Sequence, residues 1–253
     1  MISCIIQARM GSSRLPGKVM KELHNKIPSL QYTINQLNCS KNVDQIIVAT
    51  SELSEDNVIE DLVRQNNMCC FRGNAQDVLD RYYQCAKKLK LETIVRITAD
   101  CPLIDPKIVD SVIDLYQNKK SDYAHNILPR TFPDGEDVEV FSFEALEIAW
   151  SNARLPSERE HVTPYFRNNS SHFKINNLMN NVNLSHLRWT LDYEDDLKLI
   201  MEIVKRINKR PILLQDILSV LKMEPNLIEI NNEHIQDEGY HKSLEIDRKF
   251  LNK

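Results

Sequence analysis

Short apolar runs alternate with amphipathic segments over about the first 120 residues of the chain. Each run is apolar or β-branched and ends in polar residues, which predicts a buried strand. Four such strands are expected, at Ile2–Gln7, Gln45–Thr50, Met68–Phe71 and Thr93–Thr98. Strands that alternate with helices form a mostly parallel sheet covered on both faces, so the pattern predicts an α/β fold.

The segments between these strands have the one-sided apolar spacing of helices. Ser54 can cap a helix whose apolar residues fall on one face. The segment Asp77–Lys90 carries a continuous apolar stripe, and Asp77 is interpreted as its cap. Asp105 followed by Pro106 is a typical helix start. Ligands of parallel sheets bind beyond the carboxyl ends of the strands, so the loops after the first, second and fourth strands are the first candidates for a site.

The pattern becomes mixed beyond about residue 120. Two strands and two helices are expected there: strands at Asp137–Phe141 and Leu187–Asp192, and helices at about Ser142–Asn152 and Asp195–Lys209. The Asn-rich stretch from 168 to 183 predicts irregular loops and short strands, and the polar tail beyond Asn226 is expected to pack along the surface. These features favour one domain over residues 1–253 with a mixed α/β insertion at about 121–186.

Composition narrows the functional class. The chain has 253 residues, of which 42% are hydrophobic, enough to form a sizeable core. The net charge of −4 argues against a general nucleic-acid-binding protein, because such proteins are usually basic. No apolar run approaches the roughly 20 residues that span a bilayer, so no membrane partner is expected. The six cysteines lack the spacing of a zinc site, and we expect reduced thiols in a cytoplasmic protein.

The loop after the first strand is the most informative segment of the sequence. The loop contains no acid, and it carries three cations and two glycines, namely Arg9, Arg14, Lys18, Gly11 and Gly17. Glycines let the backbone approach an anion closely, and arginine and lysine bind phosphate. The loop therefore predicts a triphosphate site, with a basic surface loop before a helix as the alternative. It is not a Walker A loop, because its two glycines stand one residue too far apart.

Two stretches of this segment resemble a known family signature. Ile5-Ile6-Gln7-Ala8-Arg9 and Ser13-Arg14-Leu15-Pro16-Gly17-Lys18 are similar to the N-terminal motif of the sugar cytidylyltransferases, which include the CMP-KDO and CMP-acylneuraminate synthetases. The intervening Met10-Gly11-Ser12-Ser13 is most similar to the branch of spore coat polysaccharide biosynthesis protein F. The resemblance extends from Ile5 to Leu197, with matches in the tail at Gly239-Tyr240 and Ser243.

The resemblance implies a three-layer α/β/α nucleotide-diphospho-sugar transferase fold, which is Rossmann-like and has a mostly parallel sheet. It also implies that the loop wraps the phosphates of CTP. The implied nucleotide-binding residues of the loop are Ala8, Arg9, Gly11, Ser13, Arg14 and Lys18. Arg14 and Lys18 are the implied catalytic cations, and Lys18 is the strongest candidate for stabilising the charge that develops as pyrophosphate leaves.

Two acids that follow predicted strands are candidates for metal binding. Asp100 lies just past the fourth strand, where a helix cap or a turn former is an equal alternative by position alone. Asp192 ends the strand expected at Leu187–Asp192. The resemblance matches Asp100 to a magnesium-binding acid with a part in catalysis and nucleotide binding, and Asp192 to a second magnesium ligand. Cys101 departs from the Gln-Gly-Asp-Glu-Pro motif of the CMP-KDO synthetases.

Arg72, Gly73 and Arg81 follow the third strand and match the same branch. The match implies that they recognise the cytosine or the ribose of the nucleotide. The alternative is a helix cap beside solvated arginines, which needs no ligand.

Two acid-rich segments are candidates for the acceptor site. Asp137 and Glu139 share one face of a predicted strand and could bind sugar hydroxyls or act on a proton of the nucleophile, unless they form a solvated edge. Glu160 and His161 match the branch and could line the acceptor pocket, although a lone histidine is more often structural.

The preferred hypothesis is a magnesium-dependent cytidylyltransferase that transfers CMP from CTP to a sugar or sugar acid and releases pyrophosphate, for cell-surface polysaccharide or glycan biosynthesis. The related synthetases suggest a homodimer. One alternative is a glycosyltransferase that uses a finished nucleotide-sugar, whose Asp-x-Asp motif is absent around Asp100. The other is a non-catalytic nucleotide- or sugar-binding regulatory protein, against which the joint presence of Arg14, Lys18, Asp100 and Asp192 argues.

Overall fold

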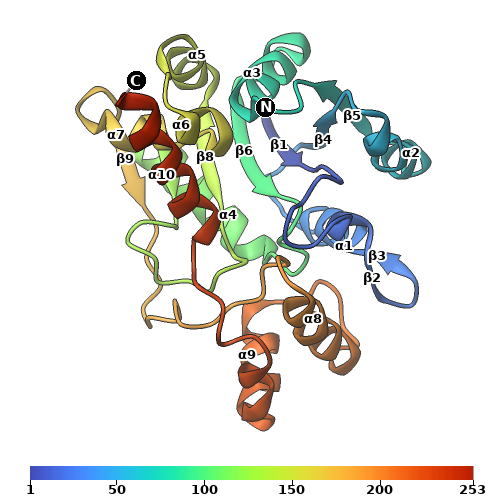
Figure 1. The fold of residues 1–253 in the computed structure, drawn as a ribbon. Coiled ribbons are helices and arrows are strands. Elements are labelled where there is room, and N and C mark those ends of the chain that lie inside the picture. Colours follow the sequence, from blue (N-terminus) through green and yellow to red (C-terminus); the bar gives the residue numbers. More distant parts are fainter. Residues whose placement is uncertain (253) are drawn as a thin grey trace.

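A seven-stranded sheet forms the centre of the computed structural model, which describes residues 1–252. Its strand order is β5-β4-β1-β6-β8-β7-β9 (Figure 1). The strands are β1 (Ile2–Gln7), β4 (Gln45–Ser51), β5 (Cys69–Gly73), β6 (Thr93–Thr98), β7 (Tyr123–His125), β8 (Glu139–Ser142) and β9 (Ile175–Asn177). A separate hairpin pairs β2 (Glu22–His24) with β3 (Ile27–Pro28).

The sheet is mostly parallel, as the sequence pattern predicts. β1 pairs in parallel with β4 on one side and with β6 on the other, and β4 pairs in parallel with β5. β8 runs antiparallel to both β6 and β7. After β5 the chain crosses back over β1 to form β6, so the strand order reverses between β1 and β6. In open α/β sheets this reversal opens a crevice at the carboxyl ends of the strands, where ligands bind.

Helices cover both faces of the sheet, because successive side chains of a strand point to opposite faces. Cys4 and Ile6 of β1 belong to one buried cluster, together with apolar residues of α1 (Ser29–Leu37), α2 (Asn57–Gln65) and α4 (Pro106–Lys119). Ile5 belongs to a second cluster with α3 (Val78–Leu89), α5 (Phe143–Asn152) and α7 (Pro164–Asn168). The three-layer α/β/α architecture is therefore confirmed.

Two of the three predicted helix starts are confirmed. Asp77 accepts a hydrogen bond from the backbone N–H of Asp80 and caps α3. Asp105 caps α4 through the N–H of Lys107, with Pro106 in the first position. The prediction for Ser54 is wrong, because Ser54–Asp56 forms a turn of 3₁₀ helix that precedes α2, and Asp56 rather than Ser54 flanks the helix.

The strand predicted at Leu187–Asp192 does not form. The segment makes one isolated bridge, between Arg188 and Asp134, and Leu191 donates its backbone N–H to the carbonyl of Asp100 at 2.7 Å. Leu187, Trp189 and Leu191 are buried at alternate positions. Thr190 and Asp192 are buried as well, so the segment alternates in apolar and polar residues and not in burial. An extended loop packed on the core can carry this alternation without a partner strand.

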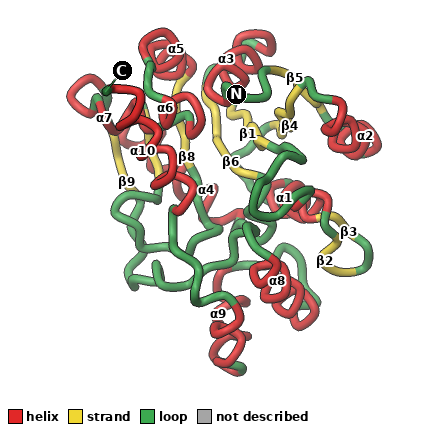
Figure 2. Tube along the Cα trace, viewed as in Figure 1, coloured by secondary structure: helices red, strands yellow, loops and turns green. Residues whose placement is uncertain are grey.

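The C-terminal part of the chain returns to the sheet. α8 (Glu194–Arg206) and α9 (Leu214–Met223) lie at one end of the molecule, beside the long loops drawn green in Figure 2. α10 (Glu238–Leu251) then runs back and packs beside α6 (Pro156–His161) (Figure 1). The tail was expected to lie along the surface, but the first turns of α10 reach the central cavity. None of the helices described over residues 1–252 is both long and apolar enough for a membrane span.

Candidate active site

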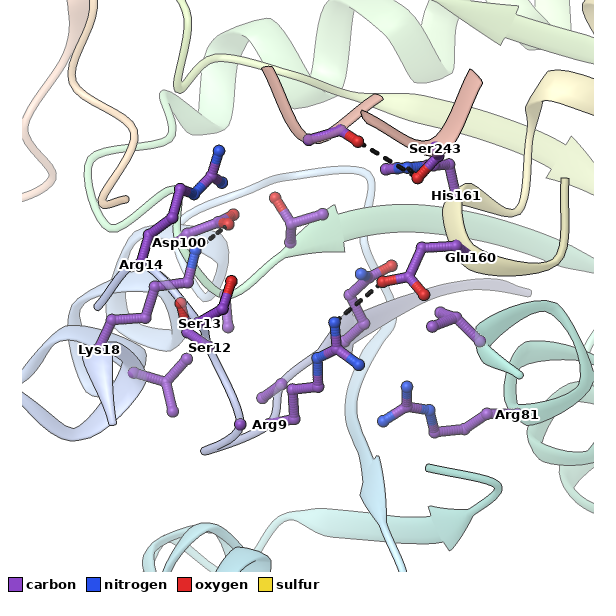
Figure 3. Close-up of a pocket in the computed structure, with 18 of the residues that line it drawn as sticks. Arg9, Ser12, Ser13, Arg14, Lys18, Arg81, Asp100, Glu160, His161 and Ser243 are labelled. Carbon is purple, nitrogen blue, oxygen red and sulfur yellow. Dashed lines mark hydrogen bonds and ion pairs between the residues drawn. The ribbon is translucent and has the colours of Figure 1, made fainter. Parts of the chain in front are cut away.

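A cavity of about 450 Å³ lies at the carboxyl ends of β1 and β6, where the strand order reverses. The loop after β1 forms one wall of this cavity and the loop after β6 forms another. Figure 3 shows Arg14, Lys18 and Asp100 at one end, with Arg9, Arg81 and Glu160 at the other. His161 and Ser243 border the same space from a further side. The fold therefore brings the two predicted loops together around one polar cleft.

The loop of residues 8–18 is held in shape by its own backbone and by one buried acid. The carbonyl of Met10 accepts the N–H groups of Ser12 at 2.8 Å and of Gly17 at 3.0 Å. Gly17 has a φ of 68°, which glycine adopts without strain. The N–H of Met10 donates to the buried Asp56 at 2.7 Å. These bonds fix the path of the loop along the wall of the cavity.

Lys18 bridges the two acids that were predicted as metal ligands. Its ammonium nitrogen lies 2.6 Å from a carboxylate oxygen of Asp100 and 2.7 Å from one of Asp192. Burial opposes the ionisation of Asp192, but Lys18, Arg14 and Arg188 outweigh it and lower its pKa to about 2. Burial also lowers the pKa of Lys18, yet the two carboxylates raise it above its ordinary value. Lys18 and Asp192 are therefore both charged at neutral pH.

Two arginines complete the charge cluster around Asp192. Arg14 lies 2.7 Å from Asp192 and 3.1 Å from Glu238 at the start of α10. Arg188 contacts Asp192 at 3.1 Å and Asp134 at 2.6 Å. Arg14 lines the main cavity, whereas Arg188 does not. Arg188 was not predicted, because its role depends on acids that the fold brings to it.

Arg81 occupies the other end of the cavity without a partner for most of its donors. The residue is 1% exposed, and its Nε and one terminal nitrogen form no hydrogen bond within residues 1–252. Burial lowers the pKa of Arg81, and nearby Arg9 adds to this effect. A buried guanidinium without hydrogen bonds is costly, so its donors are suited to acceptor atoms of a ligand. Arg9 forms an ion pair with Glu160 at 2.9 Å on the adjacent wall.

Ala8, Gly11 and Ser13, which the sequence proposes as nucleotide-binding residues, line the same cavity. Arg72 and Gly73 do not line it. The guanidinium of Arg72 instead donates to the carbonyl of Ser51 at 2.9 Å and pairs with Glu60 at 2.8 Å. These contacts assign Arg72 to the support of the neighbouring loop, so the geometry gives no contact with a nucleotide at this position.

The predicted acceptor residues are divided between the cavity and the core. Glu160 and His161 line the main cavity. Asp137 pairs with Arg130 and lines an adjoining cavity of about 170 Å³. Glu139 lies away from both cavities, because it is 1% exposed and its carboxylate pairs with Arg96. Its place in the strand puts it beneath the site, where it holds Arg96 and cannot meet a substrate.

The donor set at Asp100 and Asp192 fits magnesium. Both carboxylates already contact one cationic nitrogen, so both can face one cation. Mg²⁺ in proteins is commonly held by one or two carboxylates together with phosphate oxygens and water. No group of three or more histidine, cysteine or acidic side chains arranged for a metal occurs within residues 1–252. The site therefore fits a cation that is shared with a phosphate ligand, and it lacks the ligands of a structural metal site.

A Rossmann-like sheet with a cationic loop and two acids at its switch point defines the class of nucleotide-dependent α/β transferases. A family model described as cytidylyltransferase matches residues 3–219 of this chain. The protein therefore belongs to the cytidylyltransferase family, which supports nucleotidyltransferase activity.

The relatives and solved structures agree with this assignment. An uncharacterized protein of Methanocaldococcus jannaschii is 36% identical over 238 residues, which cover 93% of this chain and 96% of the relative. The spore coat polysaccharide biosynthesis protein SpsF of Bacillus subtilis is 30% identical over 231 residues, or 88% of this chain and 94% of the relative. A solved cytidylyltransferase structure from Leptospira borgpetersenii is 35% identical, with a TM-score of 0.86 over 93% of this chain and 98% of that one.

Sequence reasoning missed several residues of the cavity wall. Arg96 lies in a predicted strand and Lys242 lies in the tail, whereas Ser243 was a family match in the tail to which no role was given. A charged residue within an apolar run was a usable signal for Arg96, because a strand buried on both faces rarely carries an arginine. Lys242 had no comparable signal, since only the return of α10 to the sheet brings it to the cavity.

Proposed function

We propose that the protein is a magnesium-dependent cytidylyltransferase that transfers CMP from CTP to a sugar or sugar acid. The observation that carries the proposal is the contact of one lysine, Lys18, with both Asp100 and Asp192 beside a cationic loop. This arrangement can neutralise a triphosphate and hold a divalent cation on the same phosphates. Membership of the cytidylyltransferase family supports the same reaction.

The nucleotide would lie along the length of the cavity. Its phosphates would contact Arg14 and Lys18, and its base would lie at the end that contains Arg81. A guanidinium can only donate hydrogen bonds. Cytosine offers two neighbouring acceptors, O2 and N3, whereas uracil carries a hydrogen on N3. Arg81 therefore favours cytosine over uracil, and this preference supports CTP as the donor.

The reaction is a displacement at the α-phosphorus of CTP. A hydroxyl oxygen of the acceptor forms a bond to this phosphorus, the hydroxyl proton is released, and the bond to the bridging oxygen of pyrophosphate breaks. Negative charge grows on the departing pyrophosphate, where Arg14 and Lys18 stabilise it. Magnesium held by Asp100 and Asp192 would supply further charge neutralisation. Most of the catalysis then comes from positioning and from electrostatics, as is usual for phosphoryl-type transfer.

The acceptor is expected to be a building block of a surface polysaccharide. The 30% identical relative from Bacillus subtilis is described as a spore coat polysaccharide biosynthesis protein. Polar residues dominate the wall near His161, which suits a polyhydroxylated acceptor. We therefore expect the product to be a CMP-activated sugar.

Pyrophosphate release measured with each nucleoside triphosphate and a panel of neutral and acidic sugars tests this proposal. We expect release with CTP, magnesium and one class of sugar. Lys18→Ala and Asp100→Ala should reduce the rate by at least about a hundredfold, because each removes charge stabilisation at the reacting phosphates. Lys21→Ala is a matched control, since Lys21 pairs with the exposed Glu194 outside the cavity.

Two outcomes would contradict the proposal. Tight CTP binding without turnover on any sugar would indicate a regulatory binding protein. Cleavage of a nucleotide-sugar without pyrophosphate would indicate a glycosyltransferase.

A further inference from the structure

The C-terminal helix α10 lies beyond the residues that the family model matches, yet it forms part of the cavity wall. The match ends at residue 219, whereas α10 spans Glu238–Leu251. Gly239, Lys242 and Ser243 line the main cavity (Figure 3 shows Ser243 beside His161). The helix therefore adds side chains to the cavity that the loops after β1 and β6 form.

Contacts along α10 fix it over the cavity. Glu238 in its first turn accepts a hydrogen bond from Arg14 at 3.1 Å. Asp247, which is 5% exposed, accepts the backbone N–H of Ser157 in α6 at 2.9 Å. One contact joins the helix to the phosphate loop and the other joins it to the helix that carries His161. The position of Ser243 between them is therefore well determined.

Ser243 selects one tautomer of His161. The hydroxyl of Ser243 donates its single hydrogen to the carbonyl of Gly239 at 3.2 Å. Its oxygen must then accept the hydrogen bond from Nε2 of His161, which lies 2.9 Å away. A neutral imidazole that carries its hydrogen on Nε2 has a lone pair on Nδ1. The contact with Ser243 thus leaves Nδ1 as an acceptor.

Burial and two neighbouring arginines keep the imidazole of His161 neutral. Burial, together with Arg96 of β6 and Arg167 of α7, lowers its pKa to about 4. Glu139 of β8 and Asp247 of α10 oppose this shift. The neutral ring therefore predominates at pH 7, and Nδ1 can accept a hydrogen bond from a hydroxyl.

His161 lies where the main cavity joins the smaller one. Five residues line both cavities: Arg14, Thr98, Asp100, His161 and Gly239. The smaller cavity also contains Asp134, Asp137 and Tyr240. A molecule in this space would lie beside Asp100 and at the same time reach His161. This is the placement that an acceptor needs to attack a phosphate held by Lys18.

We propose that α10 completes an acceptor site in which Nδ1 of His161 accepts a hydrogen bond from a sugar hydroxyl and Ser243 is the positioning residue that orients the imidazole. The inference rests on the proposed cytidylyl transfer and adds the side of the cavity on which the acceptor binds. Nucleotide binding should be independent of this pair, because the phosphate loop and Arg81 lie on other walls.

Replacement of Ser243 with alanine tests the proposal in the full-length protein. Steady-state pyrophosphate release with CTP and the best substrate among 3-deoxy-manno-octulosonate, an N-acylneuraminate and neutral aldoses gives the KM for the acceptor. We expect this KM to rise about tenfold in Ser243→Ala, the effect of losing one well-oriented hydrogen bond, while the Kd for CTP stays unchanged. Ser243→Thr keeps the hydroxyl and should restore the low KM.

Ser219→Ala is the matched control. Ser219 in α9 also donates to a carbonyl four residues earlier, that of Gln215, but it lies outside both cavities. It should change neither the KM for the acceptor nor the Kd for CTP. NMR of the imidazole nitrogens supplies a readout that a merely structural role of Ser243 would not move. The hydrogen should lie on Nε2 of His161 in the wild type and be shared between both nitrogens in Ser243→Ala.

The outcomes separate this proposal from the assigned reaction. An active wild type whose acceptor KM is unaffected by Ser243→Ala would overturn the role of α10 and leave the cytidylyltransferase assignment intact. A hydrogen on Nδ1 of His161 in the wild type would overturn it as well. A wild type that binds CTP but releases no pyrophosphate with any of these sugars would instead refute the proposed function.

Discussion

Lys18→Met removes one positive charge from between two carboxylates and keeps the length of the side chain. Asp192 is 12% exposed, and its pKa is lowered from 3.8 to about 2, with Lys18 as the largest favourable contributor. A shift of this size corresponds to about 2 kcal/mol of stability at neutral pH. Part of it survives in the variant, because Arg14 and Arg188 still contact Asp192. Loss of the Asp100 contact adds to the cost, so we expect Lys18→Met to reduce the free energy of unfolding by about 2 kcal/mol at pH 7.

The difference in unfolding free energy between the wild type and Lys18→Met should depend on pH in a defined direction. In the folded wild type Asp192 stays ionised down to about pH 2, whereas in the unfolded chain it binds a proton below about pH 4. Its contribution is therefore complete above pH 4 and is lost as the pH falls towards 2. The stability difference between wild type and Lys18→Met should thus be largest at neutral pH and should shrink in acid.

Urea unfolding followed by circular dichroism at several pH values measures this difference. Lys21→Met is the control, because Lys21 pairs with the exposed Glu194 and should contribute less than about 1 kcal/mol. Magnesium should raise the Tm of Lys18→Met more than that of the wild type, since Lys18 and the cation compete for the same carboxylates. Equal stability of Lys18→Met and Lys21→Met at pH 7 would refute this reasoning. So would a stability difference between wild type and Lys18→Met that stays constant down to pH 3.

Three further substitutions separate the roles of neighbouring charges. Arg81→Met should raise the KM for CTP at least about tenfold in steady-state assays while urea unfolding shows no loss of stability, because the buried guanidinium lacks partners for two of its nitrogens. Glu238→Gln should tighten CTP binding about threefold by calorimetry, since Glu238 competes with phosphate for Arg14; weaker binding would contradict this. Glu139→Gln should destabilise the fold by about 3 kcal/mol in urea, because it leaves buried Arg96 unpaired.

Local patterns were sufficient to predict the parallel half of the sheet. β1 and β6 have the predicted bounds. A buried strand of an α/β sheet has an apolar run in its sequence, and polar residues mark where the strand ends. The caps at Asp77 and Asp105 were equally predictable, since each side chain accepts a hydrogen bond from a backbone N–H no more than three residues further along the chain. The cationic loop after β1 could be located for the same reason: its position at the end of a strand is a local property.

Local patterns failed where a side chain depends on distant neighbours. Arg72 and Arg81 are both arginines of one short segment, yet the first pairs with Glu60 and the second faces the cavity. The neighbouring residues in the sequence do not show which arginine faces the cavity, because the direction of each side chain depends on tertiary packing. Glu139 was predicted to share with Asp137 one face of a strand at the acceptor site, but antiparallel pairing of β8 with β6 buries it against Arg96.

The sequence by itself determined the layered α/β architecture and which strand ends carry cations and acids, because burial periodicity and turn chemistry are properties of a few consecutive residues. Only the tertiary structure decided which of these groups meet. Lys18 and Asp192 are separated by 174 positions, and Ser243 reaches His161 across 82. Such contacts depend on the path of the whole chain: the extended loop that replaces a predicted strand brings Asp192 to Lys18, and the return of α10 brings Ser243 to His161.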